Sequence, residues 1–184
     1  MSSEAVGGSA WSAIGPTTSQ VVALSASVVG EAARRSIDVW SEAPGAIAQA
    51  VALRRRAIRL AREDQEAHLV ASEALDAATE RREQAPGAHA LGTVLGRAAD
   101  LPLEIAEVAA DAAALAALVT EDGSPHSRAD SAGAAVLAAS AVSAATLLIE
   151  VNLATAKDDE RLVRARELRV AADAAAERAR AVSA

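Results

Sequence analysis

The apolar part of this chain is built almost without aromatic side chains, and this restricts its fold more than any other feature. Of its 184 residues 52% are hydrophobic, yet Trp11 and Trp40 are its only aromatic residues. A core of Ala, Val and Leu reaches native packing density only where helices approach closely. Alanine favours helices over strands, and the valines do not alternate with polar residues. We therefore expect an all-α fold, a compact bundle of about five to seven helices with long central helices, in a single domain over 1–184 whose residues 1–8 are flexible.

Charge and residue content exclude several classes of protein. The formal net charge is −7, whereas binding to nucleic-acid phosphates needs a basic face, so we expect no nucleic-acid partner. The chain has no cysteine, which excludes disulfides, a thiolate nucleophile and cysteine-ligated zinc. His68, His89 and His126 lack the spacing of metal ligands, so we expect neither a metal nor a cofactor. The first residues lack the basic start of a secretory signal, which predicts a cytoplasmic protein.

Two long segments carry no charged residue, 5–30 and 131–149. Both are rich in Ser, Thr, Gly and Ala, and Ala and Ser gain little free energy on insertion into hydrocarbon. We interpret these segments as helices buried at the centre of the bundle rather than as membrane spans, and expect no membrane partner.

Proline and glycine residues divide the chain into the expected helices. Gly15-Pro16 should kink or split a first helix over 9–30, because proline lacks a backbone donor. Pro44 suits the start of a long helix that ends near residue 82. Ser127 is predicted to cap a helix, with Asp130 three residues later as in a capping box. Beyond the break at 85–87, the expected helices are 88–99, 102–120, 127–155 and 157–182.

One acidic residue interrupts an apolar helix face. The residues that share this face by their three- and four-residue spacing are Leu53, Ala57, Leu60, Asp64, Ala67, Ala71 and Leu75. A buried carboxylate costs several kcal/mol unless it is paired or protonated. His68, four residues after Asp64, lies within side-chain reach. Two interpretations stay open: a structural ion pair between Asp64 and an arginine, or a functional acid.

Five short segments of the chain form a set of motifs in a fixed order. They are Gly7-Gly8-Ser9-Ala10; Glu63-Asp64-Gln65-Glu66-Ala67; Pro102-Leu103-Glu104-Ile105-Ala106; Gly123, Pro125, Asp130 and Gly133; and Asn152, Leu153, Lys157 and Asp158. In order and spacing over nearly the whole chain, these segments resemble the motifs of the formiminotetrahydrofolate cyclodeaminase / methenyltetrahydrofolate cyclohydrolase family.

The resemblance implies an all-helical homodimer that performs one-carbon chemistry on a tetrahydrofolate derivative as substrate. Such an enzyme releases ammonia from a formimino group or adds water to a methenyl bridge, and it needs a general acid/base rather than a metal. The candidate catalytic residues are Asp64, His68 and Asp130. The candidate substrate-binding residues are Gly7, Gly8, Ser9, Trp11, Asn152 and Lys157.

Two observations limit this interpretation. Asp130 and Asn152 lie 22 residues apart on one predicted helix, roughly 33 Å, so they share a pocket only if a partner subunit brings one of them near. The chain also departs from the family, because it has no lysine near Gly30 and carries Glu150 in place of an arginine. Three alternatives therefore remain: a folate enzyme of this type, a relative that changes a C–N bond of a non-folate substrate, and a non-catalytic dimeric bundle.

Overall fold

The chain folds into a bundle of long α-helices. A computed structural model describes residues 14–80, 99–154 and 156–183, and the side chains in these ranges apart from those of 68–80. Within these ranges there are five α-helices and one 3₁₀ turn, which confirms the expected all-α bundle with long central helices. The elements are α1 Ile14–Arg34, α2 Ala43–Glu80, α4 Asp100–Asp122, η1 Pro125–Ser127, α5 Arg128–Asn152 and α6 Glu160–Ser183.

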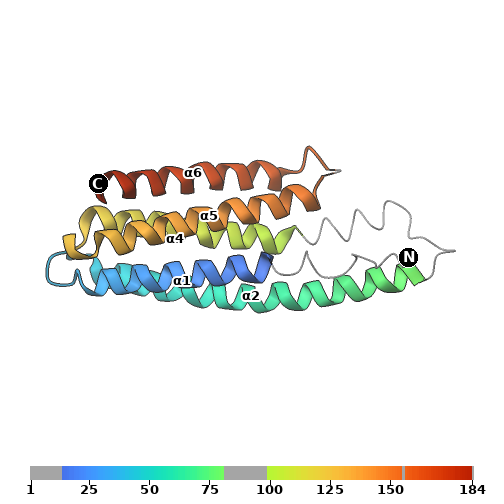
Figure 1. Cartoon of the computed structure of the whole chain (residues 1–184), viewed down its shortest axis with the longest axis horizontal. Coiled ribbons are helices and arrows are strands. Elements are labelled where there is room, and N and C mark those ends of the chain that lie inside the picture. The colour runs from blue at the N-terminus through green and yellow to red at the C-terminus, as the bar shows by residue number, and fades with distance from the viewer. Residues whose placement is uncertain (1–13, 81–98, 155, 184) are drawn as a thin grey trace, which may run out of the picture.

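The helices form three layers, as Figure 1 shows. The antiparallel pair α1 and α2 makes one outer layer, α4 and α5 make the middle layer, and α6 covers the far side of the middle layer. Helix α4 contacts all four other helices and α5 contacts α1, α4 and α6, so these two helices form the centre of the arrangement. The helix termini lie toward the two ends of the bundle, except that α2 runs on well beyond the first described residues of α1 (Figure 1).

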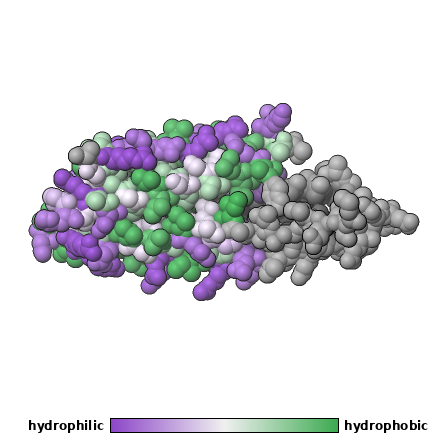
Figure 2. All heavy atoms as spheres, in the orientation of Figure 1, coloured by the Kyte–Doolittle hydropathy of each residue, from purple (hydrophilic) through white to green (hydrophobic). Residues whose placement is uncertain are grey.

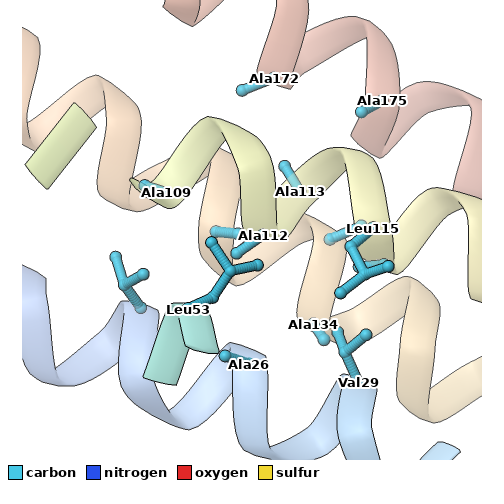
Figure 3. Packing of buried hydrophobic residues seen from close by; sticks show 14 of the residues in the cluster. Ala26, Val29, Leu53, Ala109, Ala112, Ala113, Leu115, Ala134, Ala172 and Ala175 are labelled. Carbon is cyan, nitrogen blue, oxygen red and sulfur yellow. The ribbon is translucent and has the colours of Figure 1, made fainter. Parts of the chain in front are cut away.

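Alanine side chains fill most of the core, as the shortage of large side chains requires. Figure 3 shows α4 between two layers, with Ala113 toward Ala172 and Ala175 of α6, and Ala112 toward Leu53 of α2. These side chains are nearly or fully buried. Small side chains on facing helices allow the close backbone approach that native packing density needs.

Prolines lie in the first turns of three helices. Pro16 is the third residue of α1, Pro44 the second of α2 and Pro102 the third of α4. A first-turn residue has no intrahelical partner for its N–H, so proline costs little there. Pro16 therefore does not divide α1, which continues to Arg34. The expected first helix began at residue 9, and its part before residue 14 lies outside the described residues. The expected helix over 88–99 also lies outside them, apart from residue 99.

The predicted capping box at the start of α5 is wrong. The side chain of Ser127 makes no capping hydrogen bond; its buried hydroxyl lies 3.0 Å from the carbonyl oxygen of Ser124 and 3.4 Å from that of Ala32. Asp130 instead forms an ion pair with Arg35 at 3.1 Å. The cause is the 3₁₀ turn η1, which leads directly into α5 and turns the serine inward.

One described helical stretch, Pro125–Asn152, is long and apolar enough to cross a membrane by length and composition. In this fold it is α5 with its preceding turn, and more than half of its apolar window is buried inside the protein. Such burial is typical of the core helix of a bundle.

Ser36 joins the turn between α1 and α2 to the turn between α4 and α5. Its hydroxyl donates to the carbonyl oxygen of Ala32 and accepts a hydrogen bond from the backbone N–H of Ser124, both at 2.8 Å. Gly123 lies directly against this contact, because a Cβ added there would be 2.4 Å from the backbone oxygen of Val119 and 2.8 Å from Ser36 Oγ. The glycine of this family-like motif therefore has a packing role.

We expect Gly123→Ala to lower the free energy of unfolding by about 1–3 kcal/mol, because the new methyl group meets a backbone carbonyl that cannot move alone. Gly45→Ala is the matched control, since an added Cβ there meets nothing within 4 Å. Urea unfolding of both variants measures the difference. An unchanged midpoint for Gly123→Ala would contradict this packing role.

Candidate active site

Asp64 lies where the apolar face of α2 leaves the core. Leu53, Ala57 and Leu60 on this face are nearly or fully buried, Asp64 is half-buried, and Ala67 is exposed. The sequence-predicted face is therefore correct as far as Leu60, and the carboxylate stands at its edge. A group in this position is both held by its neighbours and accessible to solvent.

The carboxylate of Asp64 packs against the backbone of Gly15. A Cβ added to Gly15 would be 1.9 Å from Oδ2 of Asp64 and 2.7 Å from its Cγ, so only glycine permits this approach. Gly15 is the second residue of α1, and the N–H groups of a first turn lack intrahelical acceptors. The positive end of the helix dipole favours a negative charge at this place.

Ser19, one turn deeper on α1, was not predicted from the sequence. Its hydroxyl is fully buried and has no hydrogen-bond partner among the described residues. It lies beside Leu60 of α2 and Ile105 of α4, around a gap with no room for a water molecule. Its four-residue spacing from Gly15 was the available signal, because that spacing puts both residues on one helix face.

Several family-like residues lie at the same end of the bundle as Asp64. Leu60 and Ile105 meet in the core, which places the start of α4 beside this part of α2. Leu103 packs on Ile149 and Leu153, which places the end of α5 beside the start of α4. Asn152, the half-buried last residue of α5, and Lys157, exposed in the following turn, are therefore at this end as well (Figure 1).

Asp130 lies at the opposite end of the bundle. It is in the first turn of α5, exposed and paired with Arg35, the residue that follows α1. Because α5 runs unbroken from Arg128 to Asn152, a single chain does not bring Asp130 and Asn152 together, in agreement with the roughly 33 Å expected from the rise of the helix.

The structure does not describe the side chains of the remaining candidates. Gly7, Gly8, Ser9 and Trp11 precede the first described residue, and His68 is described only in its backbone, one turn after Asp64 on α2. Among the described side chains, no group of three His, Cys, Asp or Glu residues could hold a metal ion.

An arginine network ties together the helices at the Asp64 end. Arg161 donates to Asp159 through Nε at 2.9 Å and Nη2 at 2.7 Å, and through Nη1 to Asp100 of α4 at 2.6 Å. Asp159 also accepts the backbone N–H of Arg161 at 3.0 Å and thereby caps α6. The side-chain hydrogen bonds from Arg161, followed by this backbone bond, lower the pKa of Asp159 from 3.8 to about 2. The same side-chain bonds raise the pKa of Arg161 above its usual value.

The network should make stability depend on pH in the acid range. Because the pKa of Asp159 is lower in the folded chain than in the unfolded chain, its contribution is complete above pH 4 and is lost as the pH falls toward 2. We expect Asp159→Asn to cost about 1 kcal/mol at pH 7, since solvent screens the pair, and only a small fraction of this at pH 2, where about half of the folded chains still carry the charge on Asp159. Urea unfolding of the wild-type chain and of Asp159→Asn at both pH values measures this difference in the free energy of unfolding. The control is Asp158→Asn, whose exposed side chain makes none of these bonds; an equal loss at both pH values would contradict the assignment to Asp159.

Comparisons with known proteins found similarity to this chain in both sequence and structure. A sequence model of the formiminotransferase-cyclodeaminase family matches residues 2–172. Among solved structures, formiminotetrahydrofolate cyclodeaminase from Thermotoga maritima superposes with a TM-score of 0.76 at 19% sequence identity, covering 92% of this chain and 86% of that one. None of the curated proteins compared with the chain matches it. The family match extends over nearly the entire sequence and confirms the resemblance of its motifs: the chain belongs to the formiminotransferase-cyclodeaminase family.

Proposed function

We propose that the chain is a cyclodeaminase- or cyclohydrolase-type enzyme that changes a C–N bond of a one-carbon-substituted tetrahydrofolate, or of a related heterocycle, by general acid/base catalysis. The observation that carries this proposal is the carboxylate of Asp64. It lies within a family-like motif, half-buried, and is held against Gly15 at the first turn of α1.

Both reactions move protons around one bridging carbon. Addition of water to a methenyl bridge needs a base to accept a proton from the water, and loss of ammonia needs an acid to protonate the departing nitrogen. A single carboxylate can do either in turn, and in our proposal Asp64 does so. His68, one helical turn later, is the second proton carrier in this proposal.

The surroundings of Asp64 suit a polar, partly anionic ligand. The N-termini of α1, α4 and α6 gather at this end of the bundle, and their dipoles favour negative charge. Asn152 supplies hydrogen-bond groups, and Lys157 supplies an exposed cation. Gly7, Gly8, Ser9 and Trp11 complete the proposed binding residues, with Trp11 stacking on the flat ring. We propose no metal or cofactor, because these proton transfers need none.

One observation favours a substrate other than folate. Glu150, which stands where the family resemblance expects an arginine, forms an ion pair with Arg166 at 3.4 Å. A glutamate and a neutralised arginine near Asn152 would weaken the binding of the glutamyl carboxylates of a folate. The second candidate is therefore the same chemistry on a heterocycle that carries fewer negative charges.

Two assays test the proposal. Hydrolysis of methenyltetrahydrofolate is followed by the loss of its near-ultraviolet absorbance, and ammonia release from formiminotetrahydrofolate by a coupled assay. Catalysis of either reaction supports the folate enzyme. Rates equal to those in buffer alone would reject it and leave two candidates, the same chemistry on a non-folate heterocycle and a non-catalytic bundle. We further propose that the protein is a cytoplasmic homodimer without nucleic-acid or membrane partners.

A further inference from the structure

The hydroxyl of Ser19 is buried without a partner, although its own helix offers one. Thr18 and Ser27, also on α1, donate to the carbonyl oxygens four residues earlier at 2.6 and 2.7 Å. Ser19 is fully buried and forms no such bond to Gly15, nor any other bond within the described part of the chain. This costs free energy, because the hydroxyl has lost its hydrogen bonds to water. Alanine, the commonest residue of this core, would avoid the cost.

Ser19 lies one helical turn inward from the contact between Gly15 and Asp64. The helices α1 and α2 are antiparallel, with Gly15 against Asp64 and Ser19 beside Leu60. Four residues separate the two members of each helix, so both contacts lie on the same two helix faces. One turn is roughly 5.4 Å along the axis. Helix side chains lean toward the N-terminus, so that of Ser19 leans toward the turn that holds Asp64.

The space beside Ser19 is closed and apolar. It has no room for a water molecule, so water does not satisfy the hydroxyl. The described residues that border this space with Ser19 are all uncharged: Val22, Ala57, Leu60, Ile105 and Val108. A ligand group that reaches the hydroxyl must also be uncharged, because an ion there would lose its hydration without gaining an opposite charge. It must carry an atom that donates or accepts a hydrogen bond.

Polar groups at this end of the bundle lie further out. Figure 2 shows mostly hydrophobic residues over the middle of the molecule, where α1 and α5 lie in Figure 1, and hydrophilic residues at the turn between α5 and α6. Lys157 belongs to this turn and is exposed. A ligand held at Asp64 therefore has a neutral interior on one side and a polar, partly cationic rim on the other.

We propose that Ser19 is the innermost substrate-binding residue of the Asp64 site, where its hydroxyl bonds an uncharged edge of a heterocycle, such as a ring carbonyl or a ring N–H. A small separation of α1, α2 and α4 opens the space beside Ser19 and admits this edge. The charged end of the substrate then points outward, toward Lys157. The binding role rests on the proposed function, whereas the opening of the space does not.

Thiol accessibility tests the opening without any assay of activity. The chain has no cysteine, so Ser19→Cys and Ser25→Cys each carry a single thiol. Ser25 is the matched control, because its hydroxyl is also fully buried without a partner but lies roughly 15 Å from Gly15 along α1. We expect the neutral reagent methyl methanethiosulfonate to modify folded Ser19→Cys about tenfold faster than folded Ser25→Cys, because local opening needs less free energy than unfolding. An anionic methanethiosulfonate should modify both slowly. Equal rates with the neutral reagent would overturn the proposal.

Removal of the hydroxyl tests its role in binding. Ser19→Ala should raise KM about 3–10-fold, the loss of one uncharged hydrogen bond, and leave kcat nearly unchanged, because the hydroxyl binds the substrate away from the reacting carbon. Ser25→Ala should change neither constant. Both variants should keep their melting temperature or raise it by up to about 2–4 °C, since each loses a buried hydroxyl without a partner. A purely structural Ser19 predicts the same thermal result with an unchanged KM, and that outcome in an active enzyme would overturn the proposal.

The two tests separate this inference from the proposed function. A wild-type chain that catalyses neither folate reaction, together with selective modification of Ser19→Cys, would reject the folate reactions and uphold the opening at Ser19 for a different heterocycle. An active wild-type chain whose KM is unaffected by Ser19→Ala would uphold the proposed function and reject Ser19 alone.

Discussion

Asp64→Asn is expected to lower kcat for methenyl or formimino substrates by about 10²–10⁴-fold, the usual contribution of a positioned acid or base. The substitution keeps the shape of the side chain and removes its ability to exchange a proton. Because the side chain is half-buried at the edge of the core, the melting temperature should change by a few degrees at most. Steady-state kinetics and thermal unfolding of the same preparation measure both effects.

Glu63→Gln is the matched control for this variant. Glu63 directly precedes Asp64, is exposed, and forms an ion pair with Arg59 at 3.3 Å. The substitution removes one negative charge from the same helix turn while leaving Asp64 in place, so we expect full activity. A strong loss of stability in Asp64→Asn with unchanged kinetics would show that Asp64 is structural.

Gly15→Ala is expected to reduce activity about 10–100-fold through the position of the Asp64 carboxylate. The new Cβ would be 1.9 Å from Oδ2, so the carboxylate must move by an ångström or more. Misplacement of a catalytic group by about 1 Å commonly costs up to 10²-fold in rate. Stability should hardly change, because the end of a side chain can turn aside and alanine is the better helix former.

The same glycine-to-alanine change at Gly45 provides the comparison. Both glycines lie in the first turn of a helix, but a Cβ at Gly45 meets no atom within 4 Å. Full activity in Gly45→Ala and reduced activity in Gly15→Ala would locate the effect at the contact with Asp64. If Gly15→Ala also retained full activity, the observed position of the carboxylate would not matter for catalysis.

The architecture could be predicted from composition and periodicity. An alanine-rich chain without Phe or Tyr has no route to a dense core other than closely packed helices, and this reasoning correctly gave long helices. The apolar spacing from Leu53 to Leu60 correctly identified the buried face of α2. Family motifs were recognisable because their residues keep a fixed order along the chain.

Contacts between distant segments could not be predicted from local patterns. The approach of Gly15 to Asp64 depends on how two helices cross, which no spacing within either helix encodes. Asp130 looked like a capping residue because it lies three residues after Ser127. In the structure a 3₁₀ turn precedes α5, and Asp130 pairs with Arg35, which lies 95 residues away in the sequence. Ser36, which joins two turns, carried no local signal at all.

The alanine core gives the protein an uneven tolerance to substitution. Each buried alanine contributes one methyl group, so trimming it removes little apolar contact, and the loss is spread over a large number of equivalent neighbours. Enlarging one is different, because facing helices such as those at Ala112 and Ala113 must separate along their whole length to admit a single added carbon. Evolution of this core is therefore confined to residues of nearly equal size, and new chemistry in such a scaffold has to arise at the ends of the helices.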